Sequence, residues 1–106
     1  MNRLYENATI IEKANVYFDG RVNSRTVIKE NGDKVTLGFM LEGDYEFNTN
    51  DKELMEVING EMDIIIAGES EWKSYSAGTS FFVPENSSFK VRVKKFSDYC
   101  CSYLKM

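Results

Sequence analysis

The chain contains no histidine, two cysteines and one proline among its 106 residues. The absence of imidazole removes the commonest metal ligand and the commonest general acid or base of enzymes. Two cysteines cannot form a tetrahedral zinc site by themselves. We therefore expect no bound metal and no cofactor. Any proton transfer must use a carboxyl, phenol, ammonium or thiol group, water or the substrate itself.

The two cysteines, Cys100 and Cys101, are neighbours in the sequence. Neighbouring side chains of a strand point to opposite faces, so a disulfide between them is not expected, and free thiols are typical of the cytosol. No run approaches the roughly 20 apolar residues of a membrane-spanning helix. The start, MNRLYENATI, lacks the apolar region of a signal peptide. We expect a cytoplasmic protein with no membrane partner.

Basic residues are scarce relative to acidic ones, with a formal net charge of −4 and a pI of about 4.8. Binding to nucleic acid needs clustered lysine and arginine to neutralise phosphates. The densest basic run, residues 90–95, alternates with apolar residues, as the solvent-facing side of a strand does. No nucleic-acid partner is expected.

Short apolar runs with a period of two dominate the chain. The stretch FKVRVKK places Phe89, Val91 and Val93 on one face, and KVTLGFML places every second residue from Val35 to Leu41 on another. Turn residues recur between such runs, and no segment shows a long helical period. Two Asn-Gly pairs, at residues 31–32 and 59–60, predict two-residue hairpins. The pattern predicts one all-β domain, a sandwich or small barrel.

Two stretches, GDYEFNTNDKELMEVINGE and GTSFFVPENSSF, resemble the paired motifs of the cupin superfamily. The resemblance implies a jelly-roll, or double-stranded β-helix, barrel. Metal-binding cupins carry three histidines and a glutamate in these motifs. The histidine places fall on Phe47, Thr49 and Phe89, and Glu53 occupies the glutamate place. One carboxylate cannot hold a transition metal against competing ligands, so a metal-free barrel is expected.

A closer resemblance extends over residues 16–104. The stretches VYFDGRVNS, GFMLEGDYEFNTNDKELMEVINGEMDI, EWKSYSAGTSFFVPENSSFKVRV and DYCCSYL are similar to the pyrimidine/purine nucleoside phosphorylase family. This resemblance implies a homodimeric, metal-independent enzyme that splits nucleosides with inorganic phosphate into free base and ribose or deoxyribose 1-phosphate. The cupin domain would span residues 16–106. Residues 1–15 would be an N-terminal extension, either an edge strand or a flexible segment.

The expected site residues follow from strand alternation together with the cupin alignment. Tyr45, Phe47 and Thr49 share one strand face, where aromatic rings could stack on any base. The predicted set comprises catalytic Glu53 and Thr49; substrate-binding Tyr45, Phe47, Phe89 and Tyr103; and phosphate-binding Arg21 and Ser24.

Alternatives remain open for single residues and for the whole chain. Glu56 lies three residues beyond Glu53, on the opposite strand face, and would replace it if the register shifted by one. Phe47 could be plain core, and Thr49 could end a strand. The barrel could also bind a small ligand without catalysis, as a sensor. A third possibility is a structural dimer whose interior is filled by Phe47, Phe82 and Phe89.

Overall fold

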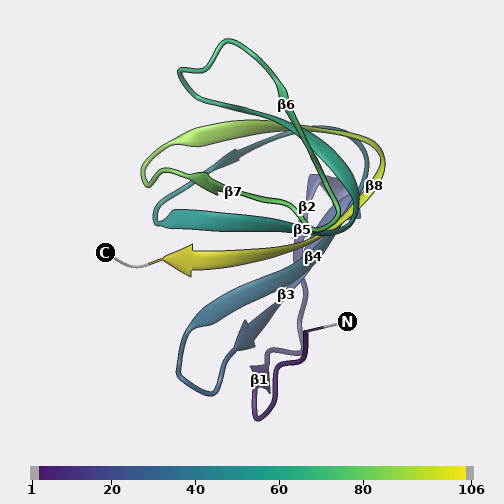
Figure 1. Ribbon diagram of the computed structural model, residues 1–106. Helices are drawn as coiled ribbons and strands as arrows, with labels where there is room; N and C mark the ends of the chain where they lie inside the picture. Colours follow the sequence, from purple (N-terminus) through teal and green to yellow (C-terminus); the bar gives the residue numbers. More distant parts are fainter. Residues whose placement is uncertain (1–2, 105–106) are drawn as a thin grey trace.

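The computed structural model describes residues 3–104 and consists almost entirely of antiparallel strands (Figure 1). The strand order within the sheet is β1-β3-β4-β8-β5-β6, with β2 also paired to β3 and β7 to β5. The elements are β1 (Thr9–Ile10), β2 (Asn15–Tyr17), a 3₁₀ turn η1 (Phe18–Gly20), β3 (Val22–Ile28), β4 (Lys34–Asn48), β5 (Lys52–Ile66), β6 (Lys73–Ser76), β7 (Ser80–Val83) and β8 (Ser88–Leu104).

Three strands, β4, β5 and β8, are 15 to 17 residues long and bend in the middle. The pairing register shifts between Leu41 and Gly43 in β4 and on both sides of residues 59–60 in β5. Such bulges insert unpaired residues and bend a strand. Figure 1 shows the long strands curving over at one side, with several of their ends gathered at the other.

The bends divide the sheet into two layers. The first layer consists of these neighbouring segments, in order: β3, the beginning of β4, the end of β8, the beginning of β5, and β7. The second layer consists of these neighbouring segments, in order: the end of β4, the beginning of β8, the end of β5, and β6. The main core lies between the layers. The predicted all-β jelly roll is confirmed.

The two Asn-Gly pairs do not form the predicted two-residue hairpins. The first lies in a longer connection between β3 and β4, where the Lys29 N–H donates to the Asp33 carbonyl at 2.8 Å. The second lies inside β5, where Gly60 has a φ of +75° and a side chain would meet the Phe96 carbonyl. Asn-Gly supplies positive φ to a bulge as readily as to a turn, so the dipeptide alone did not distinguish the two.

Strand alternation is confirmed on β8, where Phe89, Val91 and Val93 are at most 3% exposed and the intervening basic residues face solvent. On β4 the apolar alternation marks the outer face instead. Leu37, Phe39 and Leu41 are exposed there, whereas Thr36 and Met40 point inward. The more apolar face of this strand segment is therefore the outer one.

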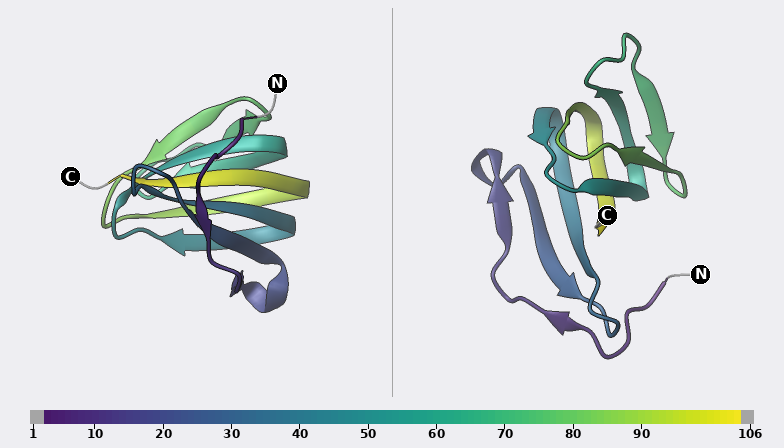
Figure 2. Two further views of the ribbon diagram at one scale, coloured as in Figure 1. Left: turned by 90° about the horizontal axis from the view of Figure 1, so that it is seen from below. Right: turned by 90° about the vertical axis from the view of Figure 1, so that its left-hand side faces the viewer.

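The N-terminal segment packs on the outside of the first layer. β1 pairs with β3, and Tyr5 and Ala8 cover a small cluster of Val27, Val35 and Cys100. Figure 2 (right) shows β1 and β2 at one edge of the molecule, away from β6 and β7. Because this segment covers Cys100 and the core covers its neighbour, both thiols are buried although they lie on opposite faces. A domain boundary at residue 15 stays a prediction.

Within residues 3–104, no helix has the length and apolar character needed to cross a membrane.

Candidate active site

A cavity of about 610 Å³ lies between the two layers, toward the end where strands β4, β5 and β8 begin or finish. Ligand pockets of proteins commonly have volumes of roughly 300–1,000 Å³. The cavity excludes the predicted alternative of an interior filled by aromatic rings. Phe82, one of the three proposed fillers, is instead 54% exposed, with the Lys52 ammonium 4.8 Å from its ring centroid.

Five of the eight predicted site residues line this cavity: Ser24, Phe47, Glu53, Phe89 and Tyr103. They come from four strands, β3, β4, β5 and β8, and the jelly roll brings them together. The rings of Phe47 and Phe89 are 5.6 Å apart between centroids and form an aromatic wall on the second layer. Ser24 is 3% exposed and accepts a hydrogen bond from the Asn15 amide at 3.1 Å.

Glu53 projects from the first layer, where its register partners are Tyr103 on β8 and Val83 on β7. The pKa of its carboxyl is raised, mainly because the group is removed from water. A hydrogen bond with the Cys101 thiol and the charge of Lys34 lower this pKa, and the charge of Asp51 raises it. A raised pKa favours the protonated acid. Glu53 therefore has the environment of a group that can give up and recover a proton.

Glu56 lies on the outer side of β5, as the strand alternation predicted. Its carboxylate accepts two hydrogen bonds from the Arg3 guanidinium, at 3.1 and 3.2 Å, and it is not among the lining residues. The register that places Glu53 inward is thus the one the structure adopts.

Lys34, Thr36 and Tyr103 form a polar group at one side of the cavity. The hydroxyls of Thr36 and Tyr103 are 3.4 Å apart, and the Lys34 ammonium is 4.4 Å from the centre of the Tyr103 ring. Burial raises the pKa of Tyr103, so its phenol keeps its proton. Lys34 is the one cation among the residues described as lining the cavity, which also include three carboxyl groups (Glu46, Asp51 and Glu53).

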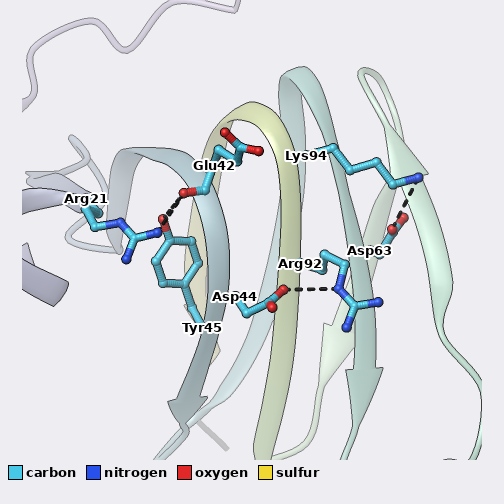
Figure 3. A network of polar contacts seen from close by, with 7 residues as sticks. All are labelled: Arg21, Glu42, Asp44, Tyr45, Asp63, Arg92 and Lys94. Carbon is cyan, nitrogen blue, oxygen red and sulfur yellow. Dashed lines mark hydrogen bonds and ion pairs between the residues drawn. The ribbon is translucent and has the colours of Figure 1, made fainter.

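Arg21, predicted to bind phosphate, is not among the lining residues. Its guanidinium donates to the Glu42 carbonyl at 2.9 Å and lies 5.5 Å from the centre of the Tyr45 ring (Figure 3). The bulge in β4 exposes the Glu42 carbonyl on this side, and the long arginine side chain satisfies it. Arg21 therefore braces the bend of β4.

Tyr45 and Thr49 point inward as expected from alternation, but neither lines the cavity. The Tyr45 hydroxyl donates to the Leu41 carbonyl at 2.7 Å and supports the same bend. The Thr49 hydroxyl donates to the Pro84 carbonyl at 2.6 Å and accepts from the Ser87 N–H at 2.9 Å. Both hydroxyls are engaged by backbone, and the roles predicted for Tyr45 and Thr49 in binding and catalysis stay predictions.

Several lining residues were missed by the sequence analysis: Tyr17, Phe18, Lys34, Thr36, Tyr99 and Cys101. A signal for the last four was present. Lys34 and Thr36 alternate with the outward-facing apolar residues of β4, and Tyr99 and Cys101 have the same period as Tyr103. Gly38 continues this inner face, and a methyl group there would overlap the Tyr99 ring. Alternating polar residues therefore face the cavity on these segments of β4 and β8, whereas at residues 90–94 they face solvent.

Among the described residues, no group of three or more histidine, cysteine, aspartate or glutamate side chains is placed to hold a metal ion. The possible donors that line the cavity are carboxyls, phenols, hydroxyls and a thiol.

Residues 12–103 match the family described as pyrimidine/purine nucleoside phosphorylase. A curated protein of that name from Chlorobium chlorochromatii is 56% identical, with 94% of this chain and 96% of that protein aligned. Another from Hydrogenovibrio crunogenus is 52% identical with the same coverage. A crystal structure of an Acinetobacter sp. ADP1 protein of unknown function has a TM-score of 0.92 and 41% identity, covering 95% of this chain and 98% of that one.

A structure of a mannose-6-phosphate isomerase homologue from Ralstonia eutropha has a TM-score of 0.69 at 12% identity, over 80% of this chain and 85% of that one. At this identity the likeness concerns the fold alone. It confirms the cupin-like architecture predicted from the paired motifs.

Proposed function

The chain belongs to the pyrimidine/purine nucleoside phosphorylase family, and we propose that the cavity between its two layers is the active site of that reaction. As a pyrimidine/purine nucleoside phosphorylase, the enzyme takes a nucleoside and inorganic phosphate as substrates. The observation that supports the location is the cavity itself, which is lined by a half-buried carboxyl, a cation and an aromatic wall.

The reaction replaces one bond at the anomeric carbon by another. The bond between C1′ and the base nitrogen breaks, its electron pair leaves with the base, and a phosphate oxygen forms the new bond to C1′. The proton of monohydrogen phosphate ends on the base, so atoms and charge balance. Phosphate is already a competent nucleophile, and the protein has mainly to position it and stabilise positive charge on the sugar.

Glu53 is the group proposed to move that proton. Its protonated carboxyl donates to the leaving nitrogen, and the resulting carboxylate faces the sugar while positive charge develops there. The carboxylate then recovers a proton from phosphate. The raised pKa of Glu53 and its place in the lining of the cavity support this assignment.

The phosphate subsite is assigned to Lys34, with Tyr103, Thr36 and Ser24 as neutral hydrogen-bond donors. An ammonium binds phosphate oxygens through charge-assisted hydrogen bonds. Lys34 is close to Tyr103 and its charge acts on Glu53, so it stands beside the proposed proton donor. The protonated form of Glu53 also avoids repulsion between a carboxylate and the incoming phosphate.

Release of free base from inosine, uridine and adenosine, with and without phosphate and with EDTA in every reaction, tests the proposal. We expect phosphate-dependent release with formation of pentose 1-phosphate and no loss in EDTA. A Glu53→Gln protein purified in parallel controls for contaminating phosphorylases. Equal activity of that variant would contradict the role of Glu53, and a loss of activity in EDTA would contradict the metal-independent reaction.

A homodimer is also proposed, with the outer face of the first layer as the interface. Five large apolar side chains are between 37% and 48% exposed there: Leu37, Phe39, Leu41, Ile58 and Phe96. The rings of Phe39 and Phe96 stack with 5.6 Å between centroids and 2° between planes. This outer apolar patch is continuous across β4, β8 and β5, which pair there. Such a contiguous patch is typical of an interaction surface.

Light scattering after size exclusion should give twice the 12.2 kDa chain mass for the wild type. Phe39→Lys should give monomer, because a charge in an apolar interface is desolvated without a partner. Phe82→Lys on β7 is the control, since Phe82 is also exposed but lies outside the patch. A monomeric wild type, or an unchanged Phe39→Lys dimer, would contradict this interface.

The proposed compartment is the cytoplasm, where the free thiols Cys100 and Cys101 would stay reduced. Cell fractionation of the native chain tests it, and recovery outside the cytoplasmic fraction would contradict it.

A further inference from the structure

The connection between β2 and β3 has an unusual backbone beside the cavity. Phe18, Asp19 and Gly20 follow one another with φ values of +51°, +56° and +89°. Residues other than glycine rarely adopt this left-handed region, and bulky ones least of all. Unfavourable backbone of this kind persists only where surrounding contacts impose it, and it is concentrated at functional sites.

Backbone hydrogen bonds hold this turn firmly. The Arg21 N–H donates to the Phe18 carbonyl at 3.1 Å, and the Leu41 N–H donates to the Arg21 carbonyl at 2.9 Å. The two residues that flank the turn, Tyr17 of β2 and Val22 of β3, are paired with each other. The side chain of Arg21 is in turn fixed by the Glu42 carbonyl, so the turn and the bend of β4 brace each other. Residues 17–20 are called the aromatic strap below.

The aromatic strap holds two large rings in the wall of the cavity without burying them. Tyr17 and Phe18 both line the cavity, yet they are 46% and 43% exposed. Their rings stand at 88° and 90° to the ring of Phe47, with centroids 6.4 and 5.6 Å away. Neither ring is stacked face to face on Phe47. Apolar ring surface therefore remains open beside the cavity.

We propose that Tyr17 and Phe18 form the outer wall of the base subsite, so that a purine or pyrimidine in the cavity stacks on their exposed ring surface, beside the wall made by Phe47 and Phe89. The inference rests on the proposed function and adds the segment that recognises the base. Stacking on rings uses the π-face that all bases share and reads no base edge. Acceptance of both purines and pyrimidines follows directly from such a subsite.

Replacing the ring of Phe18 tests the wall. Loss of base–aromatic stacking should raise the KM for inosine and uridine about 5- to 100-fold in Phe18→Ala, with kcat and the KM for phosphate nearly unchanged. Phe18→Leu keeps an apolar side chain but no ring, and should lose most of the same affinity. A nucleoside KM that stays at the wild-type value in both variants would overturn the proposal.

Two glycines provide a matched test of the backbone. Gly20 and Gly78 both have a φ of +89°, and an added Cβ at either position would have no heavy atom within 4 Å. Alanine at either position therefore meets the same backbone strain and no steric clash. Gly78 lies in the turn between β6 and β7 and does not line the cavity. We expect similar loss of thermal stability in both variants but a raised nucleoside KM in Gly20→Ala alone. Equal KM values would contradict a role for the strap.

Direct binding separates this inference from the proposed function. In a Trp72→Phe background, which removes the one native tryptophan, Phe18→Trp places a fluorophore on the strap. Free adenine and uracil should quench it in the absence of phosphate, and should leave Phe82→Trp in the same background unchanged. Quenching without any turnover by the wild type would overturn the proposed function and leave the base subsite standing. Turnover without selective quenching at residue 18 would overturn the base subsite and leave the proposed function standing.

Discussion

The two layers of this barrel present different inner faces to the same cavity. The inner face of the second layer is built of apolar side chains such as Ile64, Val91 and Phe89, each at most 3% exposed, and of these three Phe89 lines the cavity. The first layer also has apolar core residues, but it directs Glu53 and Tyr103 into the cavity. The layers are made from halves of the same strands, since β4, β5 and β8 each pass through both.

The difference separates packing from chemistry within one small domain. Polar and titratable groups are costly to bury, and each needs hydrogen-bond partners or a shifted pKa. Confining most of them to one layer lets the opposite layer remain a well-packed apolar wall. Substitution of the polar groups in the first layer should therefore impair the reaction, whereas substitution of second-layer core residues that do not line the cavity should impair stability.

Glu53→Gln should give the largest effect, lowering kcat about 10²- to 10⁴-fold because the amide cannot transfer the proton. The same substitution should raise the free energy of unfolding relative to the wild type at neutral pH. Burial raises the folded-state pKa of Glu53, so ionisation on going to neutral pH removes stability that is present at acid pH. Glutamine does not ionise and avoids that loss.

The variant's advantage in the free energy of unfolding should therefore increase from about pH 5 to about pH 8, through and above the ordinary carboxyl range. Denaturant titrations of both proteins at the two pH values measure it. A variant that is inactive and also less stable at both pH values would show that Glu53 is a structural group. Its failure would then say little about proton transfer.

Ile64→Ala probes the apolar layer. Ile64 is 2% exposed in the main core and does not line the cavity. Removing its outer carbons should lower the free energy of unfolding by about 2–5 kcal/mol through lost burial and the space left behind. At a temperature where the variant is folded, kcat and both KM values should stay near wild type. A selective loss of kcat in fully folded protein would contradict the division between the layers.

How far the sequence predicts this molecule depends on whether a side chain's partner is local. The period of two on β8 is local, and it identified the buried Phe89 and Val91 correctly. The apolar run of β4 was misleading, because Leu37 and Phe39 lie on the outer patch and Thr36 faces the cavity. A hollow interior with polar walls and an outer apolar patch together reverse the usual relation between apolarity and burial.

The site shows the same limit. Glu53 and Phe47 line the cavity, as expected from the cupin spacing, which fixes the strand register around them. The environments of Arg21 and Thr49 depend on the Glu42 and Pro84 carbonyls, which a bulge and a distant turn bring to them. Neither partner follows from residue type or spacing. Lys34 was missed for a related reason, since a lysine next to a turn has the pattern of an ordinary surface residue.

Lys34→Met and Arg21→Met compare the cation that lines the cavity with the one that braces its edge. Loss of a charge-assisted hydrogen bond should raise the KM for phosphate about 10- to 100-fold in Lys34→Met, toward the lower value because Lys34 is exposed. Because the Lys34 charge lowers the pKa of Glu53, the variant's pH–rate profile should also move to higher pH. Arg21→Met should alter the free energy of unfolding but leave the KM for phosphate and the pH–rate profile unchanged. A phosphate effect in Arg21→Met alone would restore Arg21 as the phosphate ligand.

Thr49→Val should have the smallest effect on turnover, although Thr49 occupies a place where metal-binding cupins have a ligand. Valine keeps the shape but loses both hydroxyl hydrogen bonds, leaving the Pro84 carbonyl and the Ser87 N–H without that partner. We expect the free energy of unfolding to fall by about 1–3 kcal/mol, with kcat near wild type. Thr79→Val removes an exposed hydroxyl bond to the Ser76 carbonyl and should cost less, which makes it the control. A large fall in kcat at unchanged stability would show instead that the Thr49 hydroxyl acts on the substrate.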